Sequence, residues 1–326
     1  MHVLLTGGYG CIGSWIVRTL LERGDQALIY DLKEDPSRMR LIMGEAQARL
    51  ATFVPGDVTD LPALKSSIET HEITHVVHLA GLQVPTCRAN PILGAQVNVV
   101  GTLAVFEAVR ETRGRVERLV YASSAAVFGP PEDYPPGPLA DDVKLTPTTH
   151  YGFFKCCNEG NAQVYYRDHG LSSIGLRPWT VYGVGRDSGM TSEPTRAIKA
   201  LAVVRPYHIS YGGMQDLQFV EDVAGTFVRC LEAPYSGAKA YNLRGDVVGL
   251  PAFHRALCAA DPRAADLITF GERQLAIAYD LDDSALQRDL GPMPHTPLVI
   301  GVRRTLDHFR RLRDEGRLDT ADLEGA

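Results

Sequence analysis

A glycine-rich segment near the start of the chain constrains the fold more than any other feature. Residues 6–13 read TGGYGCIG, with a G-x-G-x-x-G pattern, directly after the apolar run His2–Thr6, which predicts a buried strand. The following residues, Ser14–Arg23, have the apolar spacing of a helix. Bare glycine backbone permits a tight turn and lets a phosphate approach the N–H groups of a helix N-terminus. The segment therefore predicts a strand–turn–helix unit that binds the pyrophosphate of a dinucleotide.

An acidic residue at the end of the next predicted strand indicates which dinucleotide is bound. Asp31 follows the apolar run Gln26–Tyr30 and lies 21 residues after Gly10. A carboxylate at this point can accept hydrogen bonds from the adenosine ribose, and it repels the 2′-phosphate of NADP. A surface turn with a solvated aspartate would explain neither the spacing nor the flanking strand and helix. We therefore expect NAD as the cofactor.

Short apolar runs alternate with helical patterns through the first half of the chain. This alternation predicts an α/β fold, a doubly wound parallel sheet with helices on both faces. The predicted strands are 2–6, 26–30, 51–54, 74–79, 118–122 and 173–177, with 241–243 as a seventh candidate. The predicted helices are 14–23, 61–70, 91–113, 149–168, 221–232 and 251–260. We assign 1–178, with about 217–247, to a dinucleotide-binding domain, and 179–216 and 248–326 to a smaller C-terminal substrate-binding lobe.

Three further side chains suit proton transfer. Tyr151 and Lys155 stand at positions i and i+4 of a predicted helix, so they share one face. A lysine cation and an oxidised nicotinamide both favour the phenolate and would lower the tyrosine pKa from its usual value near ~10. Ser124 follows a predicted strand and can offer its hydroxyl to a substrate oxygen. A tyrosine–lysine pair is common on helices, and it gains meaning here from Ser124 and the glycine turn.

Together these motifs resemble the extended short-chain dehydrogenase/reductase family, which includes nucleotide-sugar epimerases and dehydratases. They span about residues 3–225 in family order: TGGYGCIG at 6–13, Asp31, GDVTD at 56–60, HLAG at 78–81, Asn98, SSAAVFG at 123–129, YGFFK at 151–155 and LRPWTVYGVGR at 176–186. The resemblance implies a Rossmann fold, with Tyr151 as acid/base, Lys155 orienting the ribose and Ser124 as hydroxyl partner. It implies NAD contacts from Gly7, Gly10, Cys11, Ile12, Gly13, Asp31, Asp57, Val58, Leu79, Ala80, Gly81, Asn98, Tyr151, Lys155, Pro178 and Tyr182. It also implies a homodimer through helices 91–113 and 149–168.

One departure from the family pattern concerns the substrate. Nucleotide-sugar members often carry an R-D-[FY] element whose arginine binds the diphosphate, and Gln215 replaces that arginine here. A neutral amide cannot make the charge-assisted contact. Arg186, Arg196 or Arg205 could compensate, so Ser124, Arg186, Arg196 and Gln215 are the candidate substrate residues. Without compensation, the substrate would be a smaller sugar or sugar acid.

The leading hypothesis is an NAD-dependent epimerase that acts on a sugar or nucleotide sugar through a transient keto intermediate. The alternative is an NAD-dependent dehydrogenase of a free sugar or sugar acid, which Gln215 favours. A non-catalytic NAD-binding regulator is a remote third interpretation, because a sensor has no need of Tyr151 or Lys155. A dehydratase fits less well, since Ala125 and Ala126 follow Ser124 where such members carry acidic residues.

Composition excludes several other classes. The net charge of −6 and the lack of a basic block give no footprint for nucleic acid. We expect no apolar run that approaches the ~20 residues of a membrane span, and six cysteines without a CxxC pair fit reduced thiols in the cytoplasm. His71-Glu-Ile-Thr-His75 is a literal HExxH, but Ile73 and its β-branched neighbours favour a strand, which would separate the histidines. We therefore expect no metal site.

Overall fold

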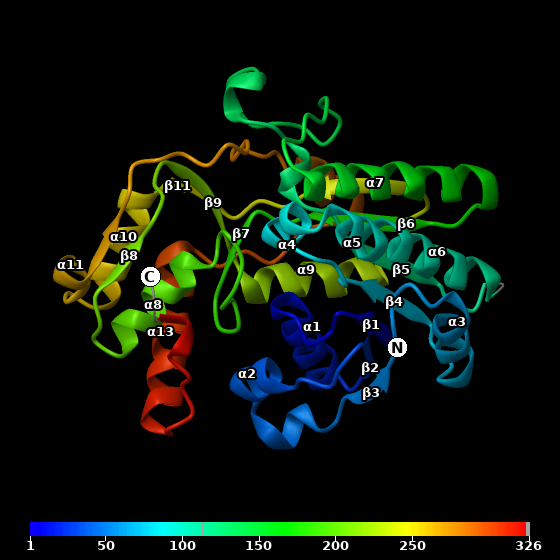
Figure 1. Cartoon of the computed structure of the whole chain (residues 1–326), viewed down its shortest axis with the longest axis horizontal. Coiled ribbons are helices and arrows are strands. Elements are labelled where there is room, and N and C mark those ends of the chain that lie inside the picture. Colours follow the sequence, from blue (N-terminus) through cyan, green and yellow to red (C-terminus); the bar gives the residue numbers. More distant parts are fainter. Residues whose placement is uncertain (113, 324–326) are drawn as a thin grey trace.

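The computed structural model describes residues 1–112 and 114–323, and a parallel sheet forms its centre (Figure 1). Within these residues seven strands pair in the order β10-β6-β5-β4-β1-β2-β3, all parallel. They are β1 (His2–Thr6), β2 (Gln26–Asp31), β3 (Thr52–Pro55), β4 (His75–His78), β5 (Arg118–Ala122), β6 (Ser173–Arg177) and β10 (Ala238–Asn242). The predicted α/β class is confirmed, and the seventh candidate strand forms as β10.

Alternation along the strands explains why both faces of the sheet are covered. In β1, Val3 and Leu5 enter one apolar core, and Leu4 between them enters the other. All three side chains are fully buried. A strand buried on both faces reads as a continuous apolar run, which is the pattern in the sequence.

Helices cover each face of the sheet (Figure 1). On one face α1 packs between α2 and α9, and α9 also contacts β5; on the other, α6 packs against α3 and α7. Their bounds are α1 (Cys11–Glu22), α2 (Ser37–Ala48), α3 (Leu61–Thr70), α4 (Val84–Ala89), α5 (Pro91–Ala95), α6 (Gly101–Glu111), α7 (His150–His169) and α9 (Val220–Glu232). A π-helical stretch, η1 (Gln96–Val100), joins α5 to α6, and short 3₁₀ turns form η2 (Ala125–Val127) and η3 (Pro131–Asp133). The predicted end of helix 91–113 lies outside the described residues.

The remaining elements form a smaller part beside the carboxyl ends of the main strands (Figure 1). They are β7 (Thr180–Tyr182), α8 (Glu193–Ala202), β8 (Tyr207–Ile209), β9 (Met214–Phe219), β11 (Asp246–Gly249), α10 (Leu250–Ala260), α11 (Ala264–Leu267), β12 (Ile268–Phe270), α12 (Ser284–Leu290), α13 (Leu298–Asp314) and η4 (Ala321–Leu323). β7, β9 and β11 make a second sheet, and β8 pairs with β12. The ends of range 217–247 therefore fall in the second sheet, whereas its α9 and β10 join the main layers. The predicted lobe boundary at 326 lies outside the described residues.

One helical segment differs from the sequence expectation about membranes. Pro91–Glu111 is long and apolar enough, by length and composition, to cross a bilayer, so the expectation that no run approaches that length is wrong. Half of its most apolar window is buried within the protein. The core helix of a globular protein passes the same test, and this segment packs against α3 and α7.

A buried ion pair fastens α7 to the sheet. The Arg177 guanidinium on β6 donates to both carboxylate oxygens of Glu159 on α7, at 2.9 and 2.7 Å. The two side chains are only 4% and 6% exposed. Ser123, at the end of β5, donates its hydroxyl to the same carboxylate. The ion pair and this hydrogen bond thus connect α7, β6 and the end of β5, the elements around the cleft described below.

We expect Arg177→Met to lower the free energy of unfolding by about 3–5 kcal/mol, because it leaves the Glu159 carboxylate buried without its counter-ion. Urea unfolding followed by circular dichroism measures the change. Arg49→Met is the control: Arg49 pairs with Glu45 on the exposed surface, so its midpoint should hardly move. Equal destabilisation by the two variants would contradict the role given to the buried pair.

Candidate active site

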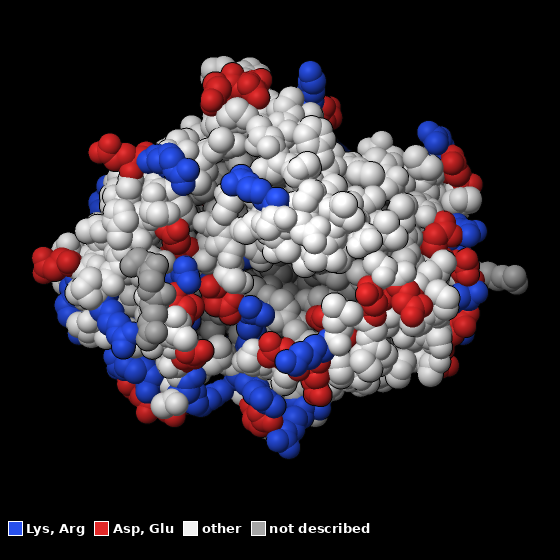
Figure 2. Space-filling view, viewed as in Figure 1, with Lys and Arg blue, Asp and Glu red and all other residues white. Residues whose placement is uncertain are grey.

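A cleft of about 570 Å³ opens where the sheet reverses its strand order, between β1 and β4. Residues at the carboxyl ends of β1, β2, β4 and β5 line it, and the loop after β7 closes one side. Figure 2 shows the hollow at the middle of one face, with basic and acidic side chains interspersed around it. In open α/β sheets, ligands bind at this reversal point.

Bare backbone makes one wall of the cleft. Gly7 has φ +69°, and a Cβ there would lie 2.8 Å from the backbone nitrogen of Ala80. No side chain caps the N-terminus of α1, so the first N–H groups of that helix stay open for an anion. These features fit the pyrophosphate of a dinucleotide.

The adenosine end of the cleft is acidic. Asp31 and Asp57 both line it, beside Val58. Asp31 accepts a hydrogen bond from the backbone N–H of Leu32 at 2.9 Å, and burial raises the pKa of its carboxyl. The carboxylates give a 2′-phosphate no favourable partner, in agreement with NAD.

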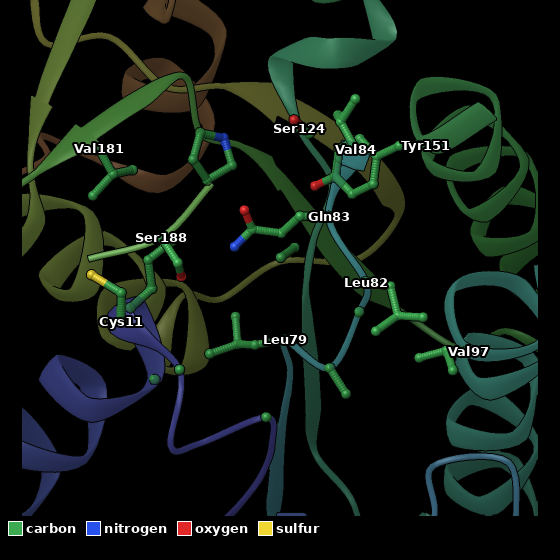
Figure 3. Close-up of a pocket in the computed structure, with 18 of the residues that line it drawn as sticks. Cys11, Leu79, Leu82, Gln83, Val84, Val97, Ser124, Tyr151, Val181 and Ser188 are labelled. Carbon is green, nitrogen blue, oxygen red and sulfur yellow. The ribbon is translucent and has the colours of Figure 1, made fainter. Parts of the chain in front are cut away.

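Most of the expected site residues meet in this cleft. Those that line it are Gly7, Gly10, Cys11, Ile12, Gly13, Asp31, Asp57, Val58, Leu79, Ala80, Gly81, Ser124, Tyr151, Lys155, Pro178 and Arg186. Figure 3 shows Cys11, Leu79, Ser124 and Tyr151 around the shared space.

Four expected residues do not line the cleft. Tyr182 is fully buried against Phe219, because β7 alternates and directs its neighbour Val181 into the cleft instead. Asn98 lies behind the wall, where its side chain exchanges two hydrogen bonds with the backbone of Leu82. Gln215 and Arg196 also lie outside. Tyr182, Asn98, Gln215 and Arg196 therefore lie behind or outside the cleft wall, and their roles in binding stay predictions.

A close contact between two backbone segments brings Tyr151, on α7, next to Ser124, which precedes η2. At the start of α7, a Cβ on Gly152 would overlap the carbonyl oxygen of Ala126 in η2. Only glycine lets the helix meet the turn this closely, and the contact sets Tyr151 beside Ser124. The Ser124 oxygen accepts a hydrogen bond from the N–H of Ala126 at 3.1 Å, which leaves its own proton free to donate.

Burial dominates the acidity of the tyrosine. Desolvation raises the pKa of Tyr151, while the hydrogen bond with Ser124 and the charge of Arg186 oppose that rise. In the protein without a cofactor the pKa of Tyr151 is therefore raised, and its lowering by Lys155 together with an oxidised nicotinamide stays a prediction. A lowered value would need the additional positive charge of an oxidised nicotinamide.

Lys155 is itself buried. Its ammonium donates to the carbonyl oxygen of Ala122 at 2.6 Å and lies 5.5 Å from the centre of the Tyr151 ring. Desolvation lowers its pKa from 10.5 to about 8. The cation is held in place by one carbonyl, with capacity left for a ribose hydroxyl.

Among the cleft residues that were not predicted from the sequence, Arg38 and Gln83 carry polar groups that a ligand could meet. Arg38 on α2 makes a bidentate ion pair with Asp187 in the loop after β7, at 2.9 and 2.8 Å. Gln83 directs its amide into the middle of the cleft (Figure 3). Gln83 follows the HLAG motif and could have been found from it, whereas the Arg38 pair joins residues 149 positions apart.

The HExxH segment has the predicted non-helical conformation. Glu72 has φ +50° in a turn, and His75 opens β4. The two histidines therefore do not share a helix face. Among the described residues, no group of three or more His, Cys, Asp or Glu side chains is placed to hold a metal ion.

The fold and the cleft define a dinucleotide-binding enzyme of the Rossmann class. Residues 3–243 match the model of the NAD dependent epimerase/dehydratase family, and the chain belongs to this family. It is accordingly an NAD-dependent enzyme of the extended short-chain dehydrogenase/reductase type.

Named relatives extend this assignment. The chain is 31% identical over 266 residues to a UDP-glucose 4-epimerase of Erwinia amylovora, covering 74% of this chain and 77% of the relative. The Thermus thermophilus UDP-glucose 4-epimerase in complex with NAD superposes with a TM-score of 0.77 at 26% identity, covering 95% and 99% of the two chains. A partial-consensus L-threonine 3-dehydrogenase shares the fold, with a TM-score of 0.84 at 23% identity and coverage of 95% and 100%.

We expect Lys155→Met to stabilise the cofactor-free protein at pH 7.5 by about 1–3 kcal/mol, because a buried cation is removed. The unfolded lysine holds its proton up to its ordinary pKa of 10.5, and the folded one releases it near 8. Between about pH 8 and pH 10.5 the free energy of unfolding of the wild type therefore rises relative to that of the variant. Urea unfolding at pH 7.5 and pH 10 tests the sign, and a gap between the two proteins that does not shrink at pH 10 would refute it.

Proposed function

We propose that the protein is an NAD-dependent epimerase of a carbohydrate. The observation that carries this is the convergence of Ser124, Tyr151 and Lys155 on a cleft whose other wall is the glycine turn. The family match and the epimerase relatives support the same reaction type.

The residues divide the work of oxidising a secondary alcohol. When bound, the cofactor would accept the hydride that leaves the carbinol carbon and, in an epimerase, would supply it again to the opposite face of the keto intermediate. Tyr151 takes the hydroxyl proton, and Ser124 donates its one hydroxyl proton to the substrate oxygen. Lys155 would hold the ribose, and its charge together with that of the oxidised nicotinamide would favour the anionic phenol. In an epimerase, Tyr151 returns the proton after the keto intermediate has turned its other face.

A dehydrogenase of a free sugar or sugar acid is the second candidate, and Gln215 favours it. Its side chain is fully buried and bonds to Thr180 and to the carbonyl oxygen of Gly212, each at 3.3 Å. It therefore offers no contact to a diphosphate in the cleft. Incubation with candidate sugars and NAD⁺ separates the two reactions: stoichiometric NADH favours the dehydrogenase, and isomerised product without NADH favours the epimerase.

We expect Tyr151→Phe to lower turnover by at least roughly 10²–10⁴-fold, because the proton acceptor is lost. Affinity for NAD, measured by calorimetry, should stay within a few-fold, which also separates an enzyme from a non-catalytic NAD-binding regulator. Tyr166→Phe is the control, since Tyr166 lies on the same helix with an exposed side chain. Persistent turnover in Tyr151→Phe would end the catalytic assignment.

We also propose that the protein is a homodimer in the cytoplasm. Large apolar side chains are exposed on α5, on η1 and on α7: Ile92, Leu93, Val100, Phe153 and Val164. α4 and α5 pack against α7, so these positions belong to one helical layer. A second copy of the same layer would cover them by a two-fold axis. The free cysteines, two of them buried, agree with a reducing compartment.

We expect Phe153→Asp, at a side chain that is 60% exposed, to shift the protein to a monomer at micromolar concentration. A charge buried at a two-fold contact meets its own copy, so the penalty acts twice. Light scattering after gel filtration measures the mass. Val299→Asp, at an exposed site on α13, serves as the control. A wild-type monomer would overturn the proposed dimer.

A further inference from the structure

Arg186 is the guanidinium in the cleft that is not paired with a carboxylate in the part of the chain that the structure describes. Its Nη2 donates to the hydroxyl of Thr191 at 3.1 Å, and its buried Nε has no hydrogen-bond partner in the part of the chain that the structure describes. The other two cations that line the cleft are engaged. Arg38 is paired with Asp187, and Lys155 donates to Ala122.

Gln83 presents a second polar group to the same space. It follows β4 and extends its amide into the middle of the cleft, between Ser188 and Tyr151 (Figure 3). No hydrogen bond from this amide to another described residue is present. A Cβ on Gly189 would overlap its oxygen, and the nearest Arg186 nitrogen lies 3.3 Å from that same point. The Gln83 amide and the Arg186 guanidinium therefore both lie next to Gly189.

The positive charge of Arg186 acts on the Tyr151 phenol. It is one of the influences that lower the pKa of Tyr151 against burial. Arg186, Ser124 and Tyr151 all line the same cleft, so an anionic group bound by Arg186 would lie in the space that also holds the proton-transfer residues.

The cleft holds no second cation suited to a diphosphate among the residues that the structure describes. Gln215 is buried elsewhere, and Arg196 lies outside, near the carboxylate of Asp322. One guanidinium with one amide matches a single planar carboxylate, which accepts two parallel hydrogen bonds from a guanidinium.

We propose that Arg186 and Gln83 form a carboxylate-recognition subsite, so that the substrate is a small hydroxy acid of the sugar-acid class. This inference rests on the proposed function and names its substrate class. The carboxylate bonds to the Arg186 guanidinium, the Gln83 amide donates to the carboxylate or to a neighbouring hydroxyl, and the carbinol lies at Tyr151.

Ligand pairs that differ in the acidic group test the subsite. Suitable pairs are glycerate with glycerol, threonate with threitol, gluconate with glucitol, and glucuronate with glucose, with UDP-glucose as a further arm. Calorimetry on the NADH-loaded full-length protein measures binding, and NADH or isomer formation measures turnover. We expect at least one acid to bind roughly 10- to 100-fold more tightly than its neutral partner.

Variants connect that preference to the residues. Arg186→Gln should abolish the preference and raise KM for the acid with a smaller change in kcat, and Arg186→Lys should restore part of it. Gln83→Ala should weaken binding of the acid several-fold. Arg205→Gln is the matched control, because Arg205 is exposed outside the cleft, and it should leave the preference intact.

Other outcomes overturn the subsite. One is the absence of any acid preference across the panel. Another is tighter binding of UDP-glucose than of every acid, which would mark a nucleotide-sugar site. A third is a loss of NAD affinity in Arg186→Gln without loss of acid preference, which would assign Arg186 to the cofactor pyrophosphate. Because binding needs no turnover, an acid that binds through Arg186 without any hydride transfer would refute the proposed function and keep the subsite.

Discussion

The site depends on two close backbone contacts in which one partner is a glycine. Gly7 meets the strand end at Ala80, and Gly152 meets the turn at Ala126. The first contact leaves the cleft wall bare for a dinucleotide, and the second places the phenol beside the serine. A methyl group at either point would overlap backbone atoms, which cannot move aside as a flexible side chain can. The packing of the main chain thus positions the cleft wall and the tyrosine independently of any charge interaction.

Burial disfavours the charged forms of the two titratable side chains in the site. Enclosing Tyr151 and Lys155 disfavours the charged form of each, so the phenol keeps a raised pKa and the ammonium a lowered one. The protein therefore folds around a proton-transfer group that is uncharged more readily than it would be in water. Binding an oxidised nicotinamide reverses part of that balance for the phenol, which couples acidity to the state of the cofactor.

The sequence was sufficient for the main sheet, because its strands are apolar runs of the right length between clear helical patterns. It was also sufficient for the glycine turn and the trio, whose spacing is local. The sequence was not sufficient where the direction of a side chain, or its interaction partner, depends on residues far away in the chain. Tyr182 belongs to a family motif, yet strand alternation turns it away from the cleft. Arg38 lies in α2, which was not predicted; Gly44 breaks its helical geometry with φ +82°, and the Asp187 partner is invisible to any local pattern.

The Arg38–Asp187 ion pair has a consequence for cofactor exchange. It links α2, beside the adenosine end, to the loop that carries Arg186, and both partners line the cleft. If a bound dinucleotide has to pass between α2 and this loop when it leaves, both hydrogen bonds of the Arg38–Asp187 pair must break first. The residence time of the cofactor and the ordering of the substrate loop would then share one rate, and added salt would quicken both.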